Sequence, residues 1–68
     1  MNLADAIKKE LEEKRITQVE LGKKLNQNRQ AINKHLSSWK KGKTPTIPLL
    51  KKWCNAIGCD YKKFLPYL

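Results

Sequence analysis

Four neighbouring residues, Arg29, Gln30, Asn33 and Lys34, carry side chains that could hydrogen-bond to the edges of nucleic-acid bases. Arginine and lysine donate to O6 and N7 of guanine, whereas glutamine and asparagine pair with N6 and N7 of adenine. On a helix, their spacing places them on one face, and Ser37 extends that face by a turn. None of these side chains is acidic. The pattern therefore indicates a base-reading surface, provided that a helix carries it.

The charge of the chain indicates a polyanionic partner. Its 68 residues include 15 Lys and Arg against 6 Asp and Glu, a formal net charge of +9. Residues 1–14 carry three lysines and four acids, whereas residues 15–68 carry twelve bases and two acids. Between Lys23 and Lys43 there are seven basic residues and no acid. Crowded charge of one sign lowers stability, so we interpret this excess as functional.

Apolar residues recur at helical spacing along the chain and show no strand-like alternation. A residue suited to cap a helix precedes each periodic segment: Asn2, Thr17, Asn28, Thr46 and Asp60. The expected helices cover residues 3–14, 18–25, 29–40, 47–57 and 61–65. Pro66 is expected to stop the last of them. We therefore predict one all-α domain spanning residues 1–68.

The second expected helix is short. Val19, Leu21 and Leu25 are its apolar positions, and Asn26 can end it in the left-handed conformation. Gly22 lies in its interior, where glycine costs about 0.8–1.0 kcal/mol relative to alanine. We interpret that cost as a sign that another helix packs closely over Gly22.

The third and fourth expected helices each have an inward stripe. In the third, the stripe consists of Ile32, His35, Leu36 and Trp39. Because Trp39 continues the periodicity, this helix is expected to reach Trp39 or Lys40. In the fourth, the stripe consists of Leu50, Cys54 and Ile57. Trp53 is expected on its flank.

Residues 17–32, TQVELGKKLNQNRQAI, resemble the TQ-x-EL-A-x-x-L-G-x-S-x-x-x-I signature of the phage Cro and repressor helix-turn-helix family. The segments GKTP at 42–45 and AIGCD at 56–60 resemble that family's connector and the end of its fourth helix. The resemblance covers about residues 7–65. It implies a five-helix lambda-repressor-like DNA-binding domain, with the helix-turn-helix at the second and third helices.

Carried onto this sequence, the resemblance assigns base contacts to Arg29, Gln30 and Lys34, with Asn33 beside them. Contacts to the DNA backbone are expected from Gln18, Asn28, Ser37, Lys40, Lys43 and Thr44. The implied partner is a double-stranded DNA operator, expected to be pseudo-palindromic and bound by a homodimer, with a monomer in solution left open. Gly42 follows Ile32 by ten residues, more than in relatives. Either the third helix or its connector is therefore longer here, and Trp39 favours the helix.

Other function classes find less support in the sequence. The alternative is a protein-interaction module on the same fold, such as an antitoxin, antirepressor or adaptor. Catalysis is not expected, because there is one histidine, no paired carboxylates and no glycine-rich phosphate loop. Cys54 and Cys59 lack the second ligand pair of a zinc site and are expected to be reduced core residues. No metal, cofactor or small-molecule substrate is therefore expected.

The location expected from the sequence is the cytoplasm of a bacterial cell, at the nucleoid when DNA is bound. No apolar run approaches the roughly 18–20 residues that span a bilayer. No charged-then-apolar leader precedes the first helix, so neither export nor membrane contact is expected.

Overall fold

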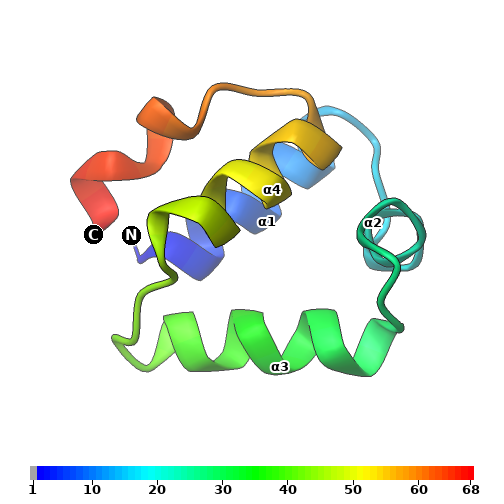
Figure 1. Cartoon of the computed structure of the whole chain (residues 1–68), viewed down its shortest axis with the longest axis horizontal. Coiled ribbons are helices and arrows are strands. Elements are labelled where there is room, and N and C mark those ends of the chain that lie inside the picture. Colours follow the sequence, from blue (N-terminus) through cyan, green and yellow to red (C-terminus); the bar gives the residue numbers. More distant parts are fainter. Residues whose placement is uncertain (1) are drawn as a thin grey trace.

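The computed structural model describes residues 2–68 and consists, over that range, of helices and their connections (Figure 1). The helices are α1 (Leu3–Glu13), α2 (Gln18–Leu25), α3 (Arg29–Lys40), α4 (Ile47–Ile57) and the 3-10 helix η1 (Tyr61–Tyr67). The predicted all-α fold is confirmed. None of the helices in the described range is long and apolar enough to cross a membrane.

Each helix begins where a capping side chain was expected. The capping oxygen accepts a hydrogen bond from a backbone N–H of the first turn, which would otherwise have no partner. The capping residues are Asn2, Thr17, Asn28, Thr46 and Asp60. Thr17 also forms the full capping box: its Oγ1 accepts from the Glu20 N–H at 3.1 Å, and the Glu20 carboxylate accepts from the Thr17 N–H at 3.4 Å. These local hydrogen bonds fix the helix starts.

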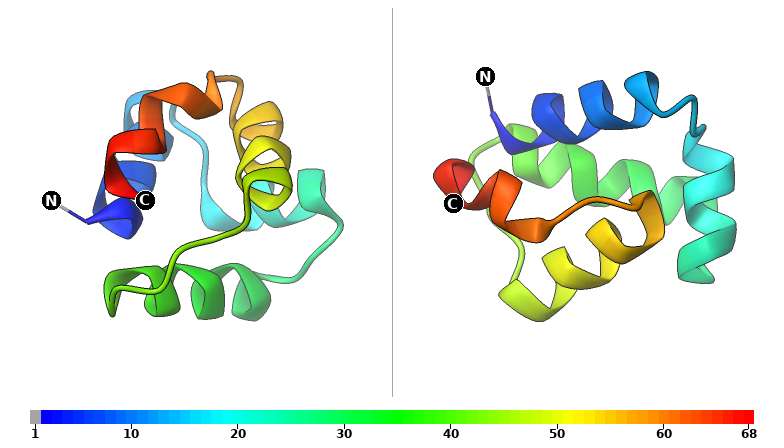
Figure 2. Two further views of the ribbon diagram at one scale, coloured as in Figure 1. Left: turned by 60° about the vertical axis from the view of Figure 1, so that its left-hand side comes forward. Right: turned by 90° about the horizontal axis from the view of Figure 1, so that it is seen from above.

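The helices enclose one apolar core. α1 and α4 lie on the same side of α3, and α2 stands across the end of α3 at which that helix begins (Figures 1 and 2). Between α3 and α4, the Trp39 and Trp53 rings meet at 4.6 Å between centroids. His35 is half-buried, with its ring 5.9 Å from that of Trp53. Trp53 was expected on the flank of α4, and its exposed fraction is 0%, because the His35 and Trp39 rings of α3 pack against that flank.

The apolar side of α2 is narrower than the sequence suggested. Leu21 is fully buried and Leu25 packs against the core, but Val19 is 47% exposed. Residues two positions apart in a helix point about 200° apart, so Val19 and Leu21 cannot both face the core. Val19 therefore points away from the core that holds Leu21.

Gly22 is closely covered, but not by another helix. A Cβ at Gly22 would lie 2.5 Å from the carbonyl oxygen of Gln27, in the turn that follows α2. The same turn is closed by a hydrogen bond of 2.7 Å from the Gln27 N–H to the Gly22 carbonyl. The expected helix–helix contact was therefore wrong, and the close approach is between α2 and its own turn.

The last helix continues past the residue that was expected to stop it. η1 includes Pro66 and ends at Tyr67, with a hydrogen bond of 3.0 Å from the Leu68 N–H to the Leu65 carbonyl. Proline is compatible with a 3-10 turn because its fixed φ falls in the range of that helix. Phe64 is the buried residue of η1 and holds the segment to the core.

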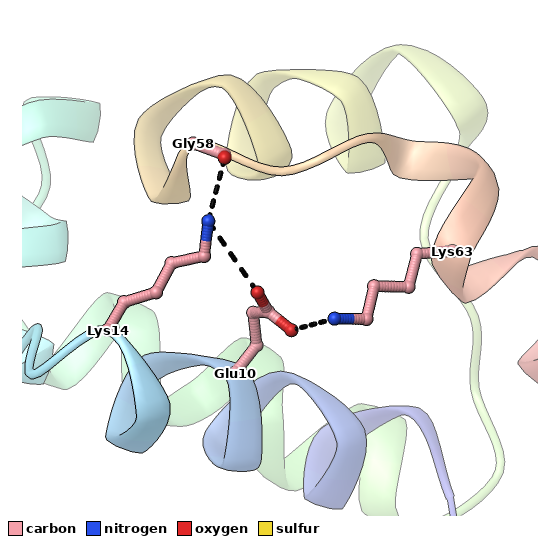
Figure 3. A network of polar contacts seen from close by, with 4 residues as sticks. All are labelled: Glu10, Lys14, Gly58 and Lys63. Atoms are coloured by element: carbon pink, nitrogen blue, oxygen red, sulfur yellow. Dashed lines mark hydrogen bonds and ion pairs between the residues drawn. The ribbon is translucent and has the colours of Figure 1, made fainter.

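A polar network joins the first and last parts of the chain (Figure 3). Glu10 is buried, with an exposed fraction of 5%. Its carboxylate accepts a hydrogen bond from Lys63 and forms an ion pair with Lys14 at 3.6 Å. Lys14 also donates to the Gly58 carbonyl at 2.7 Å. The network therefore links α1, the end of α4 and η1.

A second lysine binds the same end of α4. Lys24 on α2 donates to the Ala56 carbonyl at 3.3 Å. The last turn of α4 contains no basic residue of its own, and a cation is favourable beside the free carbonyls at a helix C-terminus. Lys14, which follows α1, and Lys24 on α2 supply that charge, so the two lysines link α1 and α2 to the end of α4.

Candidate nucleic-acid interface

The candidate site is built on α2, a tight turn and α3. Asn26 ends α2 in the left-handed conformation, with φ 57° and ψ 42°. Asn28 is extended and caps α3, accepting from the Ala31 N–H at 2.8 Å. The turn is therefore only as long as Asn26–Asn28, and its close approach to Gly22 helps to set the angle between the two helices. This is the geometry of a helix-turn-helix.

The outer face of α3 gathers the predicted polar residues. Arg29, Gln30, Asn33, Lys34, Ser37 and Lys40 are all exposed. At 3.6 residues per turn they occupy an arc of about 140°, opposite the buried Ile32, Leu36 and Trp39. α3 forms one edge of the molecule, and no other element lies beyond it (Figures 1 and 2). In the described range, nothing in the chain covers this face.

The beginning of α3 is electropositive. Its first turn contains no acid, and Arg29 lies at its first position. The backbone N–H groups of a first helical turn carry partial positive charge, and here the Asn28 side chain accepts from one of them. The same end of the helix can therefore attract a phosphate and present the Arg29 and Gln30 side chains.

The connector after α3 adds a basic segment with a defined backbone. Helix α3 extends to Lys40, so the extra residues relative to the family pattern lie in the helix. The chain then turns at Gly42, whose φ is 105°. The Lys43 N–H donates to the Ser38 carbonyl at 3.2 Å, which ties the exposed Lys43 and Thr44 to the end of α3.

Lys41 is an additional candidate that the assignment by resemblance left out. It caps the C-terminus of α3 through its backbone, and its side chain is exposed between Lys40 and Lys43. The signal in the sequence was its place in the basic run.

Lys24 is used differently from what the charge pattern suggested, and Gln18 lies at the expected start of α2 but is half-buried. Lys24, one of the seven bases between Lys23 and Lys43, is engaged by the end of α4. Gln18 starts α2 and is half-buried, beside Leu11 and Ile16 in a shallow depression against α1. The structure therefore brings the α3 face and the connector together, and places Gln18 on a different helix.

The part of the chain that the structure describes contains no candidate metal site. No group of three or more His, Cys, Asp and Glu side chains within residues 2–68 could hold a metal ion. The acids lie mainly on α1, and none lies on α3 or its connector. A face that lacks acids and is bordered by lysines is suited to a polyanion.

Comparison with known families agrees with this geometry. A family described as helix-turn-helix matches residues 7–64, which is 58 of the 68 residues. Searches of curated proteins and of solved structures returned no match. The match includes α2, the turn, α3 and the connector. The chain therefore belongs to the lambda-repressor-like helix-turn-helix family of DNA-binding transcription regulators.

Proposed function

We propose that this chain, acting as one domain over residues 1–68, binds double-stranded DNA sequence-specifically as a small Cro-like or repressor-like regulator. One observation carries the proposal: the outer face of α3 is exposed, free of acids and lined by side chains that can hydrogen-bond to base edges. An α-helix fits the major groove of B-DNA, where each base pair presents a distinct pattern of donors and acceptors. In this arrangement α3 reads the major groove.

The residues divide into two roles. Arg29, Gln30, Asn33 and Lys34 contact base edges. A second set holds the DNA backbone and fixes the register without reading sequence: Gln18, Asn28, Ser37, Lys40, Lys43 and Thr44. The support for Asn28, Lys43 and Thr44 is their exposure close to the ends of α3. The proposed contact of Gln18 with the DNA backbone requires that the start of α2 lies against a phosphate.

The partner is a pseudo-palindromic operator bound by two copies of the chain. A homodimer presents its two α3 helices about 34 Å apart, one turn of the duplex. Leu65, Tyr67 and Leu68 are exposed apolar residues on or beside η1 and offer surface for a second copy. No catalytic step is part of this proposal.

Salt dependence tests the binding itself. If each subunit neutralises about four to six phosphates, a plot of log K against log salt for a dimer has a slope of about −7 to −11. The measurement is a titration of the chain onto operator DNA selected from a random pool, repeated over a salt series. A slope near zero contradicts the proposal.

Substitutions separate the two roles. Arg29→Ala is expected to cost about 1–3 kcal/mol on the selected DNA and to relax the base preference, whereas Lys43→Ala should weaken all sequences alike. Lys43→Ala should also make the slope shallower by about 1 per subunit. The matched control is Lys62→Ala, which removes the same charge from an exposed position on η1. Equal losses for Arg29→Ala on selected and random DNA would refute direct reading of bases by Arg29.

A further inference from the structure

The end of α4 brings the two cysteines of the chain together. Gly58 adopts the left-handed conformation, with φ 90° and ψ 33°. The N–H groups of Gly58 and Cys59 both donate to the Cys54 carbonyl, at 2.7 and 3.0 Å. The second bond spans five residues, as in the Schellman motif, where the side chain after the glycine contacts the one five positions earlier. The backbone thus turns Cys59 back onto Cys54.

Both sulfurs are free, and they differ in access. Cys54 is 1% exposed, whereas Cys59 is half-buried. Both residues line an open surface hollow of about 230 Å³, together with Lys51, Asp60 and Tyr61. A reactant from solution therefore meets Cys59 first, with Cys54 directly behind it.

We propose that Cys54 and Cys59 are a redox-active dithiol, which closes reversibly to an intramolecular disulfide by reaction with a small-molecule disulfide. The Cys59 thiolate attacks one sulfur of the small disulfide, so that a mixed disulfide forms and one small thiolate leaves. Cys54 then loses its proton to solvent and attacks the Cys59 sulfur. The second small thiolate leaves as the Cys54–Cys59 bond forms. Two electrons pass from the protein dithiol to the small disulfide, which becomes two thiols.

The surroundings of the pair fit this order of steps. Burial raises the pKa of the Cys54 thiol to about 12, and the neighbouring Cys59 thiolate contributes to the rise. Cys54 is therefore a poor first nucleophile. The Lys51 ammonium lies 4.9 Å from the centroid of the Tyr61 ring in the same hollow, and its charge favours an anionic disulfide.

The short separation between the backbones of Cys54 and Cys59 also favours an intramolecular disulfide over a lasting mixed disulfide with the small molecule. The N–H to carbonyl bond between Cys59 and Cys54 already holds their backbones adjacent. A disulfide requires Cα atoms about 4.4–6.8 Å apart, so it forms only between residues whose backbones lie close together. The second step is therefore intramolecular and fast relative to attack by a second small disulfide.

The test uses the folded full chain without DNA, so its outcome is independent of the proposed function. The folded chain is equilibrated in buffers of oxidised and reduced glutathione. It is then denatured in the presence of N-ethylmaleimide, so that every free thiol is blocked, and the intact mass is measured. In reducing buffer, the mass is expected to show two N-ethylmaleimide labels per chain. In oxidising buffer, it is expected to show no label and no glutathione adduct, and to be lower than that of the unlabelled dithiol chain by two hydrogen atoms. Peptide mapping is expected to show Cys54 joined to Cys59.

Two variants separate the roles of the sulfurs. Cys54→Ala should stop at one stable glutathione adduct on Cys59, and Cys59→Ser should leave Cys54 unmodified while the chain stays folded by circular dichroism. Three results with the wild type would overturn the proposal: two labels throughout the oxidising series, a lasting glutathione adduct, or a disulfide between two chains. The wild-type result stands even if either variant fails to fold.

Discussion

The polar network around Glu10 makes the stability of the domain depend on pH. In Glu10→Gln, the amide keeps the shape of the side chain but loses the negative charge that faces Lys63 and Lys14 (Figure 3). The Glu10 side chain is 6% exposed, whereas those of Lys63 and Lys14 are 54% and 34% exposed. Removing Glu10 therefore leaves no charge buried without a partner.

The expected cost follows from that asymmetry. A hydrogen bond to a charged group contributes about 1.5–3 kcal/mol, but an exposed ion pair contributes only about 0–1 kcal/mol. Because water reaches both lysines, we expect Glu10→Gln to lower the free energy of unfolding by about 1–2 kcal/mol at neutral pH. The loss should appear in urea denaturation as a lower midpoint with an unchanged slope.

The sign of the pH dependence follows from the pKa of Glu10. The hydrogen bond from Lys63 is the main cause that holds this pKa below its ordinary value of 4.5, against the opposing effect of burial. The ionised form is thus favoured in the folded state, and its contribution is present above pH 4.5. This contribution is lost as the pH falls through the lowered pKa of Glu10. The free energies of unfolding of wild type and Glu10→Gln should therefore become equal in acid.

The assay is urea denaturation of both proteins across a pH series from neutral to acid. Glu12→Gln is the matched control, since it removes the same charge from an exposed position on α1. The free energy of unfolding of Glu12→Gln should differ little from that of wild type at any pH. A difference between wild type and Glu10→Gln that stays constant with pH, or a Glu10→Gln protein more stable at neutral pH, would refute the reasoning.

Three further substitutions test the fold and the site. Asn28→Ala removes the cap of α3 and should cost about 1 kcal/mol in urea denaturation, and an unchanged midpoint would contradict the role of its hydrogen bond to Ala31. Lys24→Met keeps the apolar stem but loses the bond to Ala56, so it should lower stability by about 0.5–1 kcal/mol while the salt slope of DNA binding stays unchanged. Leu36→Glu places an unpaired charge at a site 1% exposed and should cost about 3 kcal/mol or more in thermal unfolding, so a stable variant would show that Leu36 is not enclosed.

Short-range features were predictable from the sequence. The caps and the helices that follow them depend on interactions between residues three or four positions apart, which a pattern records directly. The outer face of α3 is predictable for the same reason, because Ile32, Leu36 and Trp39 mark the opposite side of that helix. Even the longer α3 was indicated by the periodicity that places Trp39 in the core.

The sequence was less informative where contacts between elements decide the outcome. Trp53 lies on the flank of α4 where it was expected, but its complete burial results from the packing of α3 against that flank. Gly22 was correctly associated with a close approach, but the partner was the carbonyl of Gln27.

The sequence by itself determined the helices, the helix-turn-helix and the polar face of α3, because neighbouring residues encode each of them. Only the tertiary structure decided how the charged residues are used. The pairing of Lys63 with Glu10 joins positions 53 residues apart, and the bond from Lys14 to Gly58 joins positions 44 apart. Lys24 looked like one more base of a DNA-binding run until the fold placed it against the end of α4. Such contacts depend on how distant helices meet in space, which no local spacing records.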